Sequence, residues 1–302
     1  MADLGNIGVR SPFFISETSS GAAYGILEVT INGTLRYTIR KDVIPNTTRV
    51  TFDVSELIRD YIEPVYDGSL SLSDPNPATV SISLDTYQSS GLFIQEFPYT
   101  ATAYDGYSYF SEGNNFTIAD STLMLSSATK WLPDSYSGSV YATSALGALT
   151  LDTYENQGAT IKRFGCDKYG YAKCVFINKF GVHEEVFFFG KTIENVSSTK
   201  ESYKSNISGN NGAYSANKHQ VRSFNAQGKT SYVLNTGFVG EEYNETIKQL
   251  MLSEQVWLVI GSSIVPVTPT SSDVRFRTSL NDKMVEYTVE FEQSNDLISS
   301  VR

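Results

Sequence analysis

The sequence predicts a mainly β protein, and three observations support this. Of its 302 residues, 13% are aromatic, with 19 Tyr and 17 Phe, and Thr, Ser and Val are abundant. These residue types favour pleated strands over helices. Short runs alternate strictly between apolar and polar side chains, and Asn- or Gly-containing turns separate several of them. At this length we expect two domains of ordinary size.

The stretch Tyr171–Gly190 (YAKCVFINKFGVHEEVFFFG) predicts a buried β-hairpin around which the second domain is organised. Its turn is Asn178–Gly181, and Val186–Phe189 is apolar on both faces. A two-stranded hairpin is not stable alone in water, so a sheet or a partner subunit must cover it. We expect Met284–Glu292 to be the neighbouring strand. The candidate subunit-interface residues are Phe187, Phe188 and Phe189.

The first domain begins with a polar segment that contains a short predicted edge strand, Ser11–Ile15. Ile26–Ile31 and Leu35–Arg40 both alternate and flank Asn32-Gly33, whose residues suit the positive φ of a tight hairpin turn. We therefore predict a hairpin over 26–40.

Further strands are predicted at Arg49–Val54, Val80–Leu84 and Leu92–Tyr99, with a helix over Ser55–Ile62 where the apolar spacing becomes helical. Short strands at this spacing with one helical turn between them are typical of an immunoglobulin (Ig)-like β-sandwich, which we assign to residues 1–110.

Residues 111–155 form a connector rich in Tyr, Gly and Ser, which is either a contact surface or packing between the two domains. The second β domain spans 156–302 and includes a long polar region, 191–237. Because alternation persists in parts of that region, we expect a protruding pair of strands, an arm ordered by lying on a neighbour.

The rest of the second domain contains one helix and several strands. An apolar stripe predicts the helix at Glu241–Leu252, followed by strands at Val256–Ile260, Ile264–Thr268 and Arg275–Arg277. Met284–Glu292 is the most regular strand, with one apolar face. Its other face is either solvated or lines a pore, and the candidate residues are Glu286, Glu290 and Glu292.

Charge and termini restrict the functional classes. The formal charge is −10 and no run of Lys or Arg exceeds two residues, which disfavours sequence-independent binding of DNA through its phosphates. Met1–Gly5 has neither a basic start nor an apolar core, so we expect synthesis and folding in a cytosol without a secretory signal. No apolar run approaches the ~18 residues that span a bilayer, so no membrane contact is expected.

The sequence contains no recognisable catalytic motif. Three interpretations of Cys166 and Cys174 are open. They are either two unpaired thiols or a disulfide, and the least favoured interpretation is a metal site with His183. A Cys166–His183 nucleophile pair has no evident orienting carboxylate, and His219 has no acidic neighbour. We therefore expect no enzymatic activity, no cofactor and no metal.

Two blocks of the sequence, of about 60 and about 130 residues, carry strand and helix signatures rather than a catalytic fingerprint. Their segments are RSPFFIS (Arg10–Ser16), the Ile26–Arg40 hairpin, VTFDVSELIRDYI (Val50–Ile62), VFINKFG (Val175–Gly181), FFFGKTIE (Phe187–Glu194), the Glu241–Leu252 helix, VWL (Val256–Leu258) and NDKMVEYTVEFEQSND (Asn281–Asp296). Both blocks resemble structural tail proteins of tailed phages that infect Bacteroidetes, crAss-like phages included.

The resemblance implies a virion component: a ring or baseplate-type tail subunit with an Ig-like domain and a tail-tube-like β-sandwich or barrel flanked by one helix. In such domains a long arm reaches the next subunit and inner strands form a lumen. The implied partners are copies of the chain in a closed ring of six or twelve and adjacent tail or neck proteins, with DNA a non-specific passenger. The alternative is a receptor-binding (adhesin) or capsid-decoration protein, which the Tyr/Ser/Gly/Asn-rich composition favours.

Overall fold

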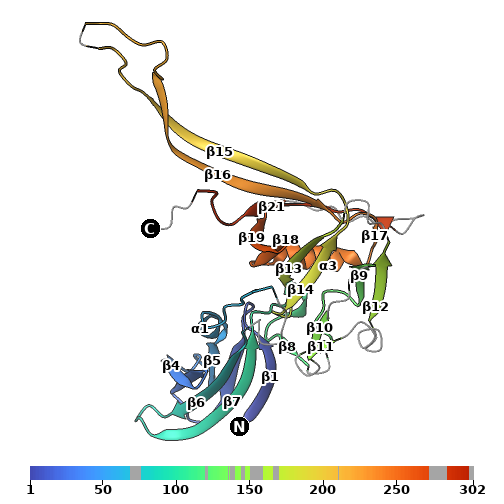
Figure 1. Cartoon of the computed structure of the whole chain (residues 1–302). Helices are drawn as coiled ribbons and strands as arrows, with labels where there is room; N and C mark the ends of the chain where they lie inside the picture. Colours follow the sequence, from blue (N-terminus) through green and yellow to red (C-terminus); the bar gives the residue numbers. More distant parts are fainter. Residues whose placement is uncertain are drawn as a thin grey trace.

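The protein is mainly β and consists of two strand-rich bodies with a long ribbon projecting from one of them (Figure 1). This is a computed structural model that describes residues 1–68, 76–119, 122–134, 136, 140–143, 147–149, 159–165, 170–209, 211–271 and 284–298. The strands of the first body lie within residues 1–118, and the ribbon extends from the second body, away from the first.

The first body is built on a six-stranded sheet in the order β4-β3-β6-β7-β1-β8. Its strands are β1 (Ala2–Gly8), β3 (Tyr24–Ile31), β4 (Thr34–Asp42), β6 (Ala78–Tyr87), β7 (Phe93–Tyr104) and β8 (Thr117–Ile118). The β1–β7 pair is parallel and the other pairs are antiparallel. The sequence did not predict β1, because Ala2–Gly8 shows little alternation and joins the sheet through residues about 95 positions away.

A second, smaller layer covers one face of this sheet. It consists of the antiparallel pair β2 (Phe14–Thr18) and β5 (Arg49–Asp53), followed by the short helix α1 (Ser55–Arg59). A side chain at Gly25 of β3 would come within 3.0 Å of Val50 on β5, so the two layers are in close contact there. Their buried side chains form one hydrophobic core, to which α1 adds Ile58.

Local signals in this body predict the structure well. Asn32 and Gly33 have φ values of 50° and 76° and form the tight turn between β3 and β4, so the predicted hairpin is confirmed. The predicted helix is too long: α1 ends at Arg59, and the chain continues through turn hydrogen bonds from Tyr61 N to Ile58 O and from Ile62 N to Arg59 O.

The second body is built on a seven-stranded antiparallel sheet in the order β14-β13-β18-β19-β21-β16-β15. Its strands are β13 (Ala172–Ile177), β14 (His183–Phe188), β15 (Ile193–Lys204), β16 (Val221–Asn235), β18 (Val256–Ile260), β19 (Ser263–Pro269) and β21 (Thr288–Gln293). The Tyr171–Gly190 hairpin is confirmed as β13–β14, but its expected neighbour is wrong. β18 lies beside β13, whereas β21 pairs with β16 and β19.

Met284–Glu292 is also not one continuous strand. It is divided into β20 (Met284–Val285), which pairs with β17 (Val239–Gly240), and β21. The predicted alternation holds across the break, because Val285, Tyr287, Val289 and Phe291 are all buried. Phe291 meets Phe188 of the hairpin through their rings, with centroids 5.9 Å apart. The two segments therefore touch across the core instead of pairing as strands.

The helix α3 (Tyr243–Leu252) packs into the hydrophobic core of the second body, as its apolar stripe predicts. Its Tyr243 hydroxyl donates to Phe187 O at 3.1 Å and accepts from Phe187 N at 3.3 Å. Leu250 and Ile247 are fully buried in the same core. Arg275–Arg277, predicted as a strand, lies outside the described residues.

Residues between the two bodies do more than connect them. They contain the 3-10 turn η1 (Phe110–Glu112), and the strands β9 (Thr129–Pro133), β10 (Val140–Thr143) and β11 (Gly147–Leu149). β9 pairs in parallel with β12 (Thr160–Phe164) and contributes Trp131 and Leu132 to the core of the second body. β9 therefore belongs to the core of the second body, which is neither the contact surface nor the packing between domains expected for this region.

The two bodies meet at the turn of the β13–β14 hairpin. Tyr107 N donates to Lys179 O at 2.8 Å, and a Cβ at Gly181 would lie 2.7 Å from Gly106 N. Arg59 of the first body forms ion pairs with Asp105, at 3.1 Å, and with Glu254 of the second. The hairpin that organises the second body thus also attaches it to the first.

Candidate functional site: the ribbon and the groove at its root

The most distinctive part of the molecule is the ribbon formed by β15 and the distal half of β16. The strands pair from Ile193↔Val233 to Lys204↔Val221, with one irregularity after Thr199. Every residue of β15 is exposed. Figure 1 shows the ribbon extending well beyond the second body, so its two strands have no hydrophobic core of their own.

The body supports only the near half of this ribbon. Leu297 N donates to Gly228 O at 2.8 Å, and the Gln227 side chain hydrogen-bonds the backbone of Ile298. Within the part of the chain that the structure describes, the hydrogen bonds and ring contacts beyond Gln227 are between residues of the ribbon itself. We call residues 200–226 the distal ribbon.

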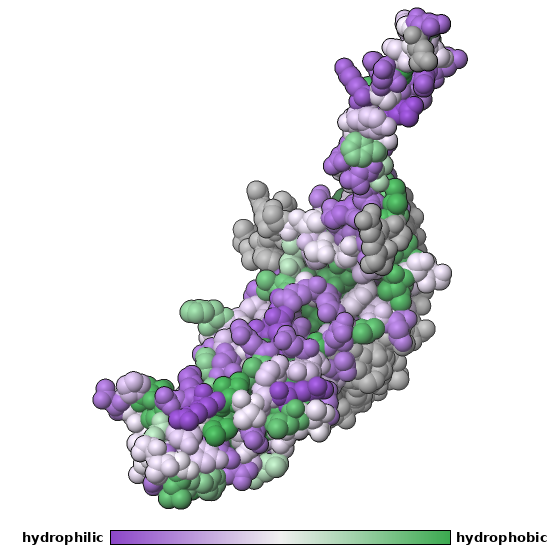
Figure 2. Space-filling model, turned by 90° about the vertical axis from the view of Figure 1, so that its left-hand side faces the viewer, coloured by the Kyte–Doolittle hydropathy of each residue, from purple (hydrophilic) through white to green (hydrophobic). Residues whose placement is uncertain are grey.

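Charge separates the arm from the rest of the chain. Residues 191–237 carry five lysines and one arginine against two glutamates, a formal charge of +4. Because the whole chain has a formal charge of −10, the rest of the chain has a charge of −14. Figure 2 shows the ribbon as a narrow, mostly hydrophilic stem with isolated hydrophobic patches. An arm of one sign on a body of the other is suited to contact between different surfaces of two copies.

The distal ribbon displays an aromatic pair on one of its faces. The rings of Tyr203 and Phe224 are 5.7 Å apart at an angle of 65°, and the side chains are 48% and 47% exposed. Arg222 is paired directly opposite Tyr203 and therefore shares this face. Tyr, Phe and Arg together are the residue types enriched at the centres of protein interfaces.

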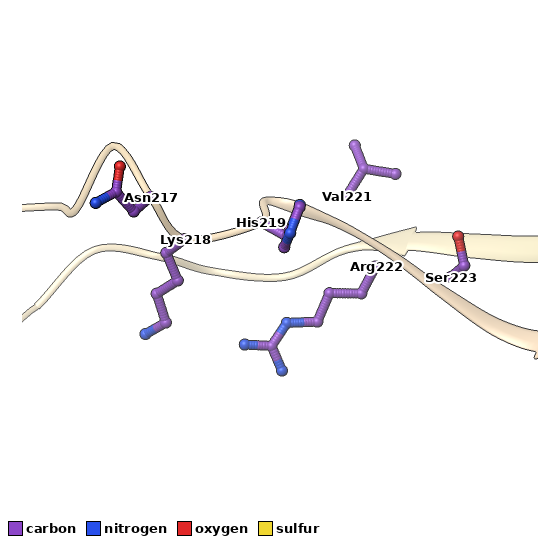
Figure 3. Close-up of a pocket in the computed structure, with 6 residues that line it drawn as sticks. All are labelled: Asn217, Lys218, His219, Val221, Arg222 and Ser223. Atoms are coloured by element: carbon purple, nitrogen blue, oxygen red, sulfur yellow. The ribbon is translucent and has the colours of Figure 1, made fainter.

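The end of the ribbon also contains an open hollow of about 590 Å³, lined by Asn217, Lys218, His219, Val221, Arg222 and Ser223. Figure 3 shows the long side chains of Lys218 and Arg222 on one side of the ribbon, with Val221 and Ser223 on the other. Because the hollow is formed by the ribbon alone, it is a basic contact surface rather than an enclosed binding site.

A second hollow lies at the root of the ribbon. This root groove has a volume of about 460 Å³ and is lined by Phe164, Phe189, Gly190, Lys191, Ile193, Val233, Asn235, Gly237, Phe238, Glu286 and Thr288. The rings of Phe164 and Phe189 are stacked, with centroids 4.2 Å apart. Phe238 is 61% exposed and Ile193 is 47% exposed. The groove is therefore apolar, with the carboxylate of Glu286 at its edge.

The acidic stripe predicted from the sequence lies on the outer face of β20–β21 and the residues between them. Glu286 and Glu290 are exposed and Glu292 is half-buried. Glu286 accepts a hydrogen bond from Asn235 Nδ2 at 2.6 Å, and Glu292 forms an ion pair with Lys229 at 2.6 Å. The structure thus brings the three carboxylates to one side of the sheet, beside the root of the ribbon.

The three candidate interface phenylalanines are not on the surface, which corrects their assignment. Phe187, Phe188 and Phe189 are 0%, 0% and 4% exposed. α3 covers Phe187 from one side, and Tyr136 approaches its ring at 4.9 Å. The core of the chain itself provides the cover that the sequence required, so these rings have almost no surface left for a partner.

The candidate chemical residues are also separated. Cys174 is a free, fully buried thiol, whereas Cys166 lies outside the described residues. His183 is buried between the rings of Tyr66 and Trp257, and His219 is exposed at the end of the ribbon. Within the described ranges, no cluster of three or more His, Cys, Asp or Glu side chains is arranged to hold a metal ion.

Sequence reasoning missed the root groove and the charge of the arm. A count of Lys and Arg against Glu over 191–237 would have revealed the charge. The groove could not be found in this way, because Phe164 and Phe238 come from separate segments that only the fold brings together.

The sequence matches no protein-family model, and a search of curated proteins found no match. Among the described residues, no helix combines the length and the apolar character needed to cross a membrane.

Proposed function

We propose that this chain is a non-enzymatic structural subunit of a phage virion that forms an oligomeric ring around the DNA channel of the tail, at the neck, along the tail or in the baseplate. The proposal includes the finer architecture: an Ig-like sandwich in the first body, and in the second a tail-tube-like domain flanked by α3. The observation that carries it is the exposed ribbon.

The physical reason is the cost of ordering the ribbon. Fixing a backbone costs roughly 1–2 kcal/mol per residue, and an isolated two-stranded ribbon is marginal in water. The distal ribbon has exposed apolar side chains and no contact with its own body among the described residues. Contact with a neighbouring copy would cover these side chains and complete the ribbon's packing.

A ring also accounts for the two different surfaces of the chain. Ring contacts are heterologous, so each subunit presents one surface to the neighbour ahead and another to the neighbour behind. A basic arm and an acidic body fit this requirement, because each surface repels its own kind and attracts the other.

The acidic stripe provides a wall for the channel. In this proposal Glu290 and Glu292, with Glu286 at one end, contribute negative charge that repels DNA phosphates and lets DNA pass without adhering. In phage carrying Glu290→Lys and Glu292→Lys we expect normal assembly but slow or blocked DNA ejection. Glu28→Lys with Glu96→Lys makes the same charge change on the first body and should eject normally. Normal ejection by the stripe variant would contradict the role in the channel.

The ring is tested by native mass spectrometry of the purified chain over a range of concentrations, with negative-stain images of any assembly. Closed rings of six or twelve are expected. The control replaces the distal ribbon with an Asn-Gly turn. This variant should keep its free energy of unfolding within about 0.5 kcal/mol and stay monomeric. Rings formed without the distal ribbon would show that another surface joins the copies.

A receptor-binding or capsid-decoration protein is the second candidate, favoured by the composition of the ribbon's end. Residues 205–220 are rich in Asn, Ser and Gly, and Tyr214 is 72% exposed, which suits adaptable contacts with a varied partner. A stable trimer in the same experiment would favour an adhesin. A monomer at every concentration would favour a decoration protein and contradict the ring.

A further inference from the structure

We propose that the aromatic face of the distal ribbon of one copy docks in the root groove of the next copy, with Arg222 placed against Glu286. This inference rests on the proposed ring, since it names the two surfaces that would join neighbouring subunits.

The ribbon cannot reach its own groove. Ile193 lines the groove and Tyr203 lies ten residues further along the same strand, about 33 Å away at the usual rise per residue. Cross-strand hydrogen bonds keep this segment extended, and Figure 1 shows it pointing away from the body. A ribbon that fills such a groove must therefore belong to another molecule.

The two surfaces are complementary in apolar character. The ribbon offers the half-exposed rings of Tyr203 and Phe224, and the groove offers Phe164 and the 61% exposed Phe238. A volume of about 460 Å³ lies within the range of roughly 300–1,000 Å³ found for pockets that enclose small ligands, so aromatic side chains fit. Burial of aromatic anchors in a preformed hollow is the usual source of binding energy at protein interfaces.

Their charged groups can also pair. Arg222 and Glu201 share the ribbon face of the aromatic pair. Glu286 and Lys191 line the groove. Seating the rings among the groove's phenylalanines brings a guanidinium to a carboxylate, a pair that forms strong, directional hydrogen bonds. A nucleic acid is a poorer occupant, because the stripe beside the groove is acidic and the chain is at −10 overall.

The contact would be heterologous and repeatable. The ribbon and the groove are separate surfaces of one chain, so each copy can donate its ribbon forwards and accept another from behind. This assigns Glu286 to the joint between subunits and leaves Glu290 and Glu292 for the channel wall.

A charge exchange tests the joint in the full-length chain. Arg222→Glu and Glu286→Arg, each alone, should raise the concentration at which copies associate by about tenfold or more, and the double variant should restore association. Lys204→Glu with Glu286→Arg is the matched control. It makes the same charge changes with the ribbon charge on the opposite face, because Lys204 is paired with Val221 (Figure 3), and it should not restore association. Restoration by both pairs would indicate attraction between net charges only and would overturn the specific contact.

A cross-link separates this inference from the ring itself. In a Cys166→Ser background, Tyr203→Cys protein is mixed with Phe238→Cys protein under mild oxidation, and a covalent heterodimer is expected only in the mixture. Rings without this link or the charge rescue would overturn the docking site and leave the ring intact. The link without closed rings would support the docking site and contradict the ring. The absence of association, including with added DNA, would overturn both, and binding to DNA alone would identify nucleic acid as the ribbon's partner.

Discussion

Lys130 Nζ lies 2.8 Å from Glu184 Oε1, and the two side chains are only 5% and 1% exposed. The same carboxylate accepts hydrogen bonds from the backbone and hydroxyl of Ser126 and from Asn178 Nδ2. A charge removed from water needs such a set of donors, because attraction between the ions alone rarely compensates for desolvation. This pair fastens β9 to the edge strand β14.

Removal of one partner should therefore be costly. Lys130→Met leaves the Glu184 carboxylate buried with no opposing charge, and we expect the free energy of unfolding to fall by about 3–5 kcal/mol. The measurement is chemical denaturation at neutral pH. The exposed pair Arg40–Asp42, whose atoms are 4.0 Å apart, provides the control, and Asp42→Asn should change stability by less than about 1 kcal/mol. Equal effects of the two substitutions would contradict the importance of burial.

Two glycines with the same backbone conformation allow a test of the contact between the bodies. Gly33 and Gly181 have φ values of 76° and 77°, but an added Cβ meets nothing at Gly33, whereas at Gly181 it lies 2.8 Å from Asp105 backbone atoms. Gly33→Ala should cost about 1–2 kcal/mol for the left-handed backbone alone. Gly181→Ala should cost roughly 1–3 kcal/mol more because of the clash. Thermal and urea unfolding of the two variants measures the difference, and similar losses would argue against the close approach.

Asp105 should make stability depend on pH. Burial raises the pKa of its carboxyl group above 3.8, and attraction to Arg59 only partly opposes this. Because the folded-state pKa is raised, the protonated Asp105 carboxyl stabilises the folded chain fully below pH 3.8. This stabilisation is lost as the pH rises through the folded-state pKa. Asp105→Asn cannot ionise, so it should gain stability relative to the wild type between about pH 3.5 and pH 7.

Urea unfolding of both proteins across this pH range measures the effect. Arg59→Met removes the opposing attraction, so in that background the gain from Asp105→Asn should become larger. A difference that does not change with pH would show that Asp105 ionises as easily in the folded chain as in the unfolded one.

Cys174 should be chemically silent in the folded protein. Burial raises the pKa of its thiol well above the usual 9.0, and the thiolate is the reactive form. In a Cys166→Ser variant we expect negligible labelling by a thiol reagent at about pH 8 and complete labelling in denaturant. Rapid labelling of the native variant would mean that β13 opens readily or is packed differently.

Much of the fold could be predicted from local sequence, because many signals act between near neighbours. The Asn32-Gly33 turn, the alternation of β3 and β4 and the stripe of α3 all depend on residues a few positions apart. Long-range pairing had no such signal. The sequence shows that Val285, Tyr287, Val289 and Phe291 share a face, but not that β21 joins β16 and β19 rather than the hairpin.

The candidate site was less predictable for the same reason. Phe187–Phe189 had the composition of an interface, and only the packing of α3 and Tyr136 shows that they are core residues. Lys130 and Glu184 had the composition of a solvated surface and are buried. In both cases the burial of a side chain is set by elements distant in sequence. The alternation noted within 191–237 is local, and β15 and β16 pair there from Ile193↔Val233 to Lys204↔Val221.

The length of the ribbon would determine the spacing between neighbouring copies in the proposed ring. If Tyr203 of one copy lies at the groove beside Ile193 of the next, equivalent points on neighbouring copies are separated by about 33 Å, the span of ten strand residues. Six copies at this spacing place the joints on a circle of about 33 Å radius, and twelve on one of about 64 Å. Because side chains alternate with a period of two, the ribbon can change in length only by an even number of residues per strand and still present the same face. In the proposed ring, the number of residues in β15 would therefore set the diameter.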